Sequence, residues 1–358
     1  MKIKFKLGEL FCGPGGIALG ASLASKNNSK IHLEHAWASD YHSDSCSTYK
    51  LNFPKADVIC EDVVNVDLNK LKPIDAFAYG FPCNDFSIVG ESKGLKGKFG
   101  GLYRYGLNVL NKFNPKFFVA ENVSGLTSAN GGKAFKKIIV ELSKAGKNGY
   151  DLVIHKYKFE QYGVPQARHR IIIVGIDKNL GLIYKVPSPT TPKKYITSKE
   201  ALEVPPIKPG ILHHEIKKQN DKVIERLKLI KPGQNVWNAK LPLHLKLNVK
   251  NTKMSQIYKR LDPDKPSYTI TGSGGGGTHG YHYKEPRALT NRERARIQTF
   301  PDSFNFIGNS ESIRRQIGMA VPPKGIKIIF ESIIKTFSKI NYPNIPANIK
   351  DLKQPDLI

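Results

Sequence analysis

The sequence predicts a doubly wound α/β domain with a smaller domain inserted into it. Short apolar runs alternate with longer helical patterns through the first half of the chain, which is typical of a parallel sheet covered by helices. The first apolar run ends in a glycine-rich turn, which can bring the backbone close to a ligand. Past Asp177 the sequence becomes rich in proline and lysine, which indicates a hinge and a less regular module.

The elements follow in chain order from these apolar runs. We expect strands at 5–11, 33–38, 56–60, 76–79, 115–120, 152–159 and 171–175. We expect helices at 103–113, 132–143, 221–230 and from Thr290 to Thr299, then two more within 310–337 that are separated by 321–323. Residues 344–358 read as a frayed tail.

The composition limits the class of protein. With 358 residues, of which 40% are hydrophobic, the chain can build one large core and a smaller one. No stretch approaches the roughly 18 uncharged apolar residues of a membrane-spanning helix, and the lysine-rich start lacks the apolar run of a signal peptide. We therefore expect a cytoplasmic protein without a membrane partner. The four cysteines form no C-x-x-C pair, so we expect free thiols and neither a zinc site nor disulfides.

The charge balance points to a polyanionic partner. Lysine and arginine number 56 against 30 aspartates and glutamates, a formal net charge of +26. Residues 178–260 hold 18 basic and 5 acidic residues, so half of the excess lies in under a quarter of the chain. A lysine-rich surface that only confers solubility is the alternative.

Three consecutive strand ends carry residues suited to an adenosine. The first strand ends in the turn that contains Gly13, Gly15 and Gly16, the second ends at Asp40, and the third ends at Glu61 and Asp62. An acid after the second strand can accept both ribose hydroxyls, and one after the third can accept from an adenine amino group. Each acid alone would be an ordinary loop residue, but the order of the three predicts a nucleoside pocket along one sheet edge.

Cys83 is the candidate nucleophile. The apolar strand 76–79 must leave the sheet near Pro82, which has no backbone N–H to pair, and this delivers the Cys83 thiol at a carboxyl strand end, where open α/β sheets bind ligands. The alternative is a cysteine that serves as a small buried hydrophobe. The following stretch, 88–103, is rich in glycine and lysine and is expected to form a mobile basic loop.

Two further strand ends place polar groups near this cysteine. Glu121 follows the strand 115–120, although it could instead cap a helix. Arg168 and Arg170 precede the apolar strand 171–175 and, in an extended segment, lie on one face. Two guanidiniums against a core strand need acceptors, which a buried carboxylate or a ligand could supply.

These stretches resemble the cytosine-C5 DNA methyltransferase family. The resemblance covers most of the chain except roughly 178–259, and its motifs stand in the family's order: ELFCGPGG at 9–16, GFPCNDFS at 80–87, ENV at 121–123, QYGVPQARHR at 161–170, RALTNRE at 287–293 with QTFP at 298–301, and QIGMAVPP at 316–323. Asn84 stands where the family more usually has Gln, and Met319 where it usually has Asn. Neither departure removes a catalytic group.

The resemblance implies an S-adenosylmethionine-dependent, Rossmann-like methyltransferase fold and roles for these residues. Cys83 would add to C6 of cytosine, and Glu121 would hydrogen-bond or protonate N3. Arg170 would hold the base O2, with Arg168 as a supporting contact. The resemblance places the remaining residues at the S-adenosylmethionine site: Phe11, Gly13, Gly15, Gly16, Asp40, Tyr41, Asp62 and Pro82.

The resemblance also implies a partner and a division of the chain. We expect a monomer on double-stranded DNA that flips its target cytosine and pairs functionally with a cognate restriction endonuclease. Residues 1–183 and 308–358 would form the catalytic domain, and 184–307 the target-recognition domain, with its variable part near 184–259. Methylation of tRNA, and a catalytically silent DNA-binding relative, are the rival functions. The intact Cys83 and Glu121 argue against the silent relative.

Overall fold

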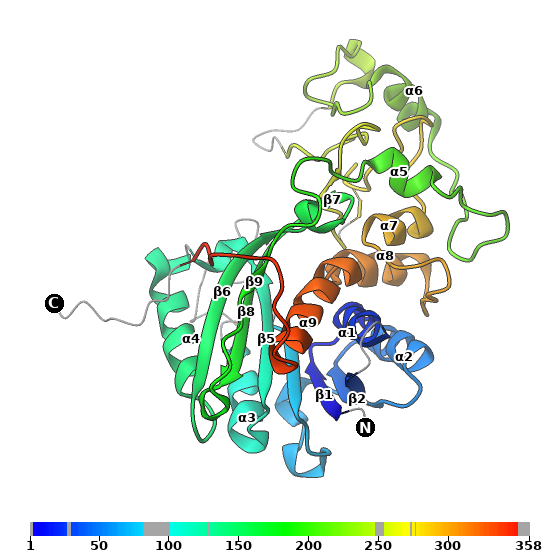
Figure 1. The fold of residues 1–358 in the computed structure, drawn as a ribbon. Coiled ribbons are helices and arrows are strands. Elements are labelled where there is room, and N and C mark those ends of the chain that lie inside the picture. The colour runs from blue at the N-terminus through cyan, green and yellow to red at the C-terminus, as the bar shows by residue number, and fades with distance from the viewer. Residues whose placement is uncertain are drawn as a thin grey trace. The chain divides into compact units, whose positions relative to one another are not determined.

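The computed structural model describes residues 3–26, 30–81, 101–127, 129–247, 254–272, 274–275 and 277–349 (Figure 1). The chain divides into two compact units. Unit 1 comprises 1–158, 169–189 and 325–358, and unit 2 comprises 159–168 and 190–324. These units differ from the expected domains, because 159–168 and 308–324 belong to the second unit. The functional division into catalytic and recognition domains stays a prediction.

Unit 1 is built on one seven-stranded sheet in the order β3-β2-β1-β4-β5-β8-β6 (Figure 1). Its strands are β1 (Ile3–Leu10), β2 (Ile31–Asp40), β3 (Asp57–Cys60), β4 (Ala76–Gly80), β5 (Phe117–Val123), β6 (Tyr150–Lys158) and β8 (His169–Asp177). The first five strands are parallel, whereas β8 runs antiparallel to both β5 and β6. The carboxyl ends of the parallel strands therefore share one edge, as the sequence predicts.

Helices cover both faces of this sheet, which confirms the doubly wound α/β class. They are α1 (Gly16–Lys26), α2 (Ser43–Asn52), α3 (Tyr103–Phe113), α4 (Lys133–Lys144) and α9 (Pro323–Phe337). Helices α3 and α4 bury Leu110 and Ile138 in one core with the sheet residues Phe77 and Phe118. On the opposite face, Phe337 of α9 packs on Phe5 with the ring centroids 5.2 Å apart.

Two glycines allow aromatic side chains to lie flat against the sheet. A Cβ at Gly8 would lie 2.4 Å from the Trp37 ring, and one at Gly175 would lie 2.1 Å from the Phe118 ring. Such distances are below any van der Waals contact, so a larger residue at either position would displace a fully buried aromatic ring.

The end of the chain departs from its expected frayed tail. The short strand β11 (Asn344–Ile345) pairs antiparallel with β9 (Val186–Pro187). Asn348 accepts a hydrogen bond from the backbone N–H of Lys156 at 2.8 Å, and its own N–H donates to His155 Nδ1. Residues 344–349 are therefore docked on unit 1, since their polar groups find long-range partners that local sequence does not reveal.

Unit 2 has little regular structure. Its elements are β7 (Gln166–Ala167), α5 (Ser198–Glu203), α6 (Asp221–Leu229), β10 (Ser267–Tyr268), α7 (Asn291–Ile297) and α8 (Ser310–Met319), and β7 pairs with β10. The described residues also form short 3-10 turns: Val63–Asn65, Leu68–Lys70, Ser124–Thr127, Ala129–Gly132, Phe159–Tyr162, Lys178–Leu180 and Leu243–Leu245. Helix α7 begins with the expected capping box, in which Thr290 and Glu293 bond each other's backbone N–H.

Among the described residues, no helix is long and apolar enough to cross a membrane.

Candidate active site

The glycine-rich turn and the end of β2 are joined directly. Leu10, the last residue of β1, pairs with Ser39, and the Cys12 N–H donates to the Ser39 carbonyl at 3.1 Å. The Asp40 carboxylate then accepts a hydrogen bond from the Gly13 N–H at 2.9 Å. The structure thus brings together the turn and the second-strand acid that the sequence proposes for one nucleoside.

The turn has a backbone that favours glycine. Gly13 and Gly15 have φ angles of +52° and +95°, and Phe11 adopts the left-handed region at +55°. A Cβ at Gly15 would come within 2.6 Å of Phe53. The turn therefore depends on small residues before Gly16 begins helix α1, and it holds backbone N–H groups near the Asp40 carboxylate.

Burial and hydrogen bonding shift the pKa of the Asp40 carboxyl in opposite directions. Loss of solvent raises the pKa of its carboxyl above the ordinary value, while the hydrogen bonds from the backbone N–H groups of His42 and Gly13 oppose this rise. The bonds from Gly13 and His42 occupy one lone pair on each oxygen, and the Tyr41 N–H is a third backbone donor to this carboxylate. A carboxylate has about four acceptor positions, so capacity for a ligand hydroxyl remains.

Two other expected cofactor residues lie at the same sheet edge. Tyr41 follows Asp40 and is 60% exposed. Asp62 follows β3, and its carboxylate accepts from the Val64 N–H at 3.2 Å, where it caps a 3-10 turn. The turn explains why an acid stands at position 62, and it leaves the adenine role a prediction.

Glu121 and Arg170 form an ion pair at the carboxyl end of β5. The Arg170 Nε lies 2.8 Å from Glu121 Oε1, and the two side chains are only 13% and 12% exposed. The sheet register explains the pair, since β5 and β8 run antiparallel with Val123 opposite Arg170. Gly80, at the end of β4, lies directly opposite Glu121, and a Cβ there would be 3.2 Å from Glu121 Oε2.

Asn122 connects this pair to the chain that leads to the cysteine. Its buried side-chain amide donates to the Phe81 carbonyl at 3.1 Å, while its oxygen accepts from the Val123 N–H. Pro82, Cys83 and the glycine-rich stretch up to residue 100 lie outside the described residues. The last described residue before Cys83 is therefore Phe81. Asn122, the neighbour of Glu121, holds the Phe81 carbonyl in place. The sequence gives Asn122 only as part of the ENV motif.

Arg168 has a different environment from Arg170. It lies between β7 and β8, is 2% exposed, and its Nη1 donates to the Ile270 carbonyl at 3.1 Å. Arg168 therefore anchors the 270 segment within unit 2. Arg170 belongs to unit 1, and its guanidinium pairs with the carboxylate of Glu121.

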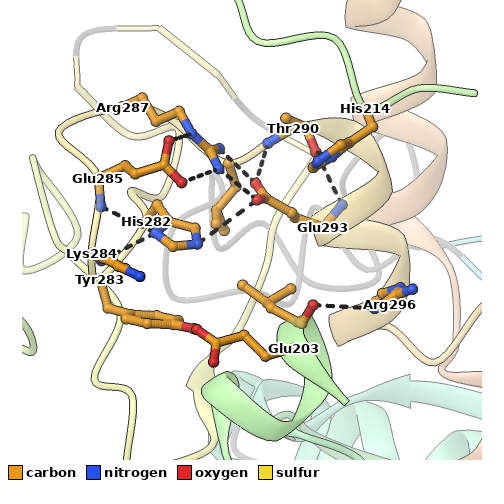
Figure 2. Close-up of polar contacts among 12 residues, drawn as sticks. Glu203, His214, His282, Tyr283, Lys284, Glu285, Arg287, Thr290, Glu293 and Arg296 are labelled. Carbon is orange, nitrogen blue, oxygen red and sulfur yellow. Dashed lines mark hydrogen bonds and ion pairs between the residues drawn. The ribbon is translucent and has the colours of Figure 1, made fainter. Parts of the chain in front are cut away.

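A second cluster of charged side chains lies in unit 2 (Figure 2). The Arg287 guanidinium donates to both oxygens of Glu293 at 2.8 and 2.9 Å and also bonds Glu285. His282 Nδ1 accepts from the Lys284 and Glu285 N–H groups, which leaves its proton on Nε2, 3.8 Å from Glu293. These groups satisfy one another's hydrogen bonds and hold the start of α7. We therefore interpret the cluster as structural.

The fold and the groups at this edge of the sheet indicate a general class of protein. A doubly wound sheet presents a glycine-rich turn, an acid after the second strand and a buried glutamate–arginine pair at the carboxyl ends of its parallel strands. These features are typical of α/β proteins that bind a ligand at this edge of the sheet.

The chain belongs to the C-5 cytosine-specific DNA methylases, whose family model matches residues 5–335. It is therefore a DNA (cytosine-5-)-methyltransferase, as the motifs predict. It is 56% identical over 355 residues to the type II methyltransferase M.BbvI of Brevibacillus brevis, covering 96% of this chain and 94% of that one. It is also 38% identical over 365 residues to the type II methyltransferase M.NgoFVII of Neisseria gonorrhoeae, covering 99% of this chain and 93% of that one.

Solved structures agree on the fold. A DNA modification methyltransferase encoded in an E. coli prophage superposes with a TM-score of 0.73 at 24% identity, over 93% of this chain and 99% of that chain. The S. pombe Dnmt2 methyltransferase superposes with a TM-score of 0.57 at 16% identity, over 93% and 99% of the two chains. This chain thus shares its fold with these two methyltransferases.

Proposed function

We propose that this protein methylates C5 of a specific cytosine in double-stranded DNA through a covalent bond between Cys83 and C6 of the base. The observation that carries the mechanism is the Glu121–Arg170 pair beside the end of β4, the strand whose continuation leads to Cys83. A carboxyl group, a guanidinium and a thiol are the groups that a cytosine ring needs for this reaction.

The residues divide the chemistry among themselves. The Cys83 thiolate forms a bond to C6, while Glu121 shares a proton with N3 and so withdraws electrons from the ring. Arg170 holds Glu121 in place and donates to the base O2, where negative charge also develops. After C5 has gained its methyl group, loss of the C5 proton reforms the C5–C6 double bond and expels the Cys83 thiolate. Arg168 would serve as a supporting contact, as the resemblance implies.

The cofactor fits the residues of the β1–β2 edge. When bound, S-adenosylmethionine supplies an electrophilic methyl group and leaves as S-adenosylhomocysteine. Asp40 would accept from its ribose, the turn of Phe11, Gly13, Gly15 and Gly16 would lie against its amino-acid part, and Tyr41, Asp62 and Pro82 would border its adenosine. The fit is supported by the remaining acceptor capacity of Asp40 and by the small residues that the turn requires.

DNA recognition and protection complete the proposal. The basic stretch 178–260 supplies cations for the phosphate backbone, and the target cytosine must leave the duplex because C5 and C6 are covered by stacking. Several relatives are type II methyltransferases. We infer that this enzyme likewise protects its host's DNA from a cognate restriction endonuclease, acting as a monomer at the nucleoid of a prokaryotic cell.

Methyl transfer is tested with tritiated S-adenosylmethionine and, in separate reactions, mixed plasmid DNA and tRNA. Label in DNA alone is the expected result, and bisulfite sequencing of that DNA then gives the methylated site. Label in tRNA alone would replace the proposed substrate, and label in neither polymer would refute the function.

The nucleophile is tested by Cys83→Ser, with Cys60→Ser as the matched control because Cys60 is an exposed free thiol. Transfer should be abolished in the first variant and retained in the second, with DNA binding intact in both. Transfer that survives Cys83→Ser would refute the assignment.

A further inference from the structure

A small basic pocket lies within unit 2. It has a cavity volume of about 220 Å³, and its lining includes Lys217, Lys218, His279, Arg294, Arg314 and one acid, Glu215. Small-molecule sites usually measure about 300–1,000 Å³. The pocket is therefore too small for most cofactors, and its charge suits a compact anion.

Arg294 brings a buried charge to this pocket. It is 3% exposed. Its guanidinium donates to the backbone carbonyls of Leu289 and His279. In the described part of the chain, no carboxylate lies within 4.0 Å of its guanidinium nitrogens. Burial lowers the pKa of Arg294 to about 10, and the nearby Arg314 charge also lowers it, while the Glu293 charge opposes this only in part.

Arg314 faces the pocket from helix α8. Its Nε is buried without a hydrogen-bond partner, and its Nη2 lies 3.3 Å from the exposed carboxylate of Glu311. The guanidinium lies directly over Gly274, where a Cβ would come within 2.2 Å of Arg314 Cζ. Arg314 is thus held in place by backbone on one side while part of its donor capacity is unused.

The cations of this pocket act on one another. Burial lowers the pKa of His279, and repulsion by the charges of Arg294, Arg314 and Lys217 lowers it further. Three cations from three segments therefore converge on one imidazole, and an anion among them would relieve this repulsion.

We propose that this pocket binds one phosphodiester group of the DNA backbone, with the forked donors of Arg294 and Arg314 at its base and Lys217 at its rim. The inference rests on the proposed DNA substrate and adds a contact that fixes the position of the duplex without reading its sequence. A guanidinium fork matches two phosphate oxygens, and the cavity admits a single phosphate.

The test is the salt dependence of DNA affinity, measured by fluorescence anisotropy with a duplex of arbitrary sequence. Arg314→Gln should weaken binding about tenfold at low salt and reduce the slope of log affinity against log salt by about 0.9, the value for one phosphate contact. Lys217→Gln, at an exposed position that cannot disturb the core, should reduce the slope in the same direction by less. Arg314→Lys, which keeps the charge, should retain the slope.

Glu311→Gln gives a change of opposite sign. It frees Arg314 from its exposed ion pair and should raise DNA affinity about twofold. Unchanged slopes in Arg314→Gln and Lys217→Gln would overturn the pocket while wild-type methyl transfer still upheld the proposed function. A wild-type protein that binds no DNA would overturn both.

Discussion

The two units hold themselves together by different means. Unit 1 satisfies its backbone through a seven-stranded ladder and buries aromatic rings on both sheet faces. The described residues of unit 2 form no long ladder, and buried arginines bond its irregular backbone instead: Arg260 donates to four carbonyls and Arg292 to three. A guanidinium has five donors in a fixed fork. It can therefore satisfy the buried backbone carbonyls of a loop-rich unit, which strand pairing satisfies in a sheet.

Removal of one such arginine should give the largest effect on stability. Arg260→Met would leave the carbonyls of Leu227, Ile230, His282 and Tyr283 without this donor and should destabilise unit 2 by about 4–5 kcal/mol. Hydrogen exchange should accelerate across 190–324 and remain slow in the sheet of unit 1. Lys240→Met, at an exposed position, is the control, and equal loss of protection in both units would contradict the comparison.

A functional test compares the two ends of β4 and β5. Glu121→Gln at the carboxyl end should lower kcat about 100-fold, equal to about 2.7 kcal/mol, because proton transfer to the base is lost. Asp75→Asn removes the other ion pair of these strands, with Lys116 at their amino end, and is the matched control. Steady-state kinetics should show kcat unchanged in Asp75→Asn, and a similar fall in both variants would deny Glu121 a special role.

The reliance of unit 1 on close packing can be tested at Gly175. An alanine Cβ would meet the Phe118 ring at 2.1 Å, so Gly175→Ala should destabilise the protein by about 2 kcal/mol in urea denaturation. Gly101→Ala, where a Cβ meets nothing within 4 Å, should cause no loss. A Gly175→Ala variant as stable as wild type would show that this face of the sheet is loosely packed.

The buried carboxyl of Glu9 should make the free energy of unfolding depend on pH. Burial raises the pKa of Glu9 well above its usual value, and the nearby Asp40 charge adds to the rise. The folded protein then keeps a proton that the unfolded chain releases as the pH rises through about 4.3, so the free energy of unfolding falls as the pH rises towards the folded-state pKa. Glu9→Gln should equal wild type at about pH 4 and exceed its stability by a margin that grows as the pH rises to about 7.5. A constant difference across this range, against exposed Glu61→Gln as control, would contradict a raised pKa of the buried Glu9 carboxyl.

The contrast between the units also explains what the sequence could predict. Strands such as β4 and the helix α3 follow from local apolar patterns, and α3 has the predicted bounds. The sequence could place Glu121 and Asp40 at one edge of the sheet, because parallel strands bring their carboxyl ends together. Arg260 gives no such signal, since its acceptors lie 22 to 33 residues away and follow no period. The hydrogen bond from Asn122 to Phe81 was missed for the same reason, as 41 residues separate the pair.

The central claim, that Cys83 bonds to C6 of a cytosine beside Glu121, is tested most directly by trapping that bond. The protein is incubated with S-adenosylmethionine and DNA in which 5-fluorocytosine replaces cytosine, because fluorine at C5 cannot leave as a proton and blocks the release of the thiolate. After denaturation, peptide mass spectrometry should find the modified base on Cys83, and Cys83→Ser should form no adduct. A DNA that becomes methylated when it contains cytosine, yet yields no adduct or an adduct on another residue when it contains 5-fluorocytosine, would contradict the account.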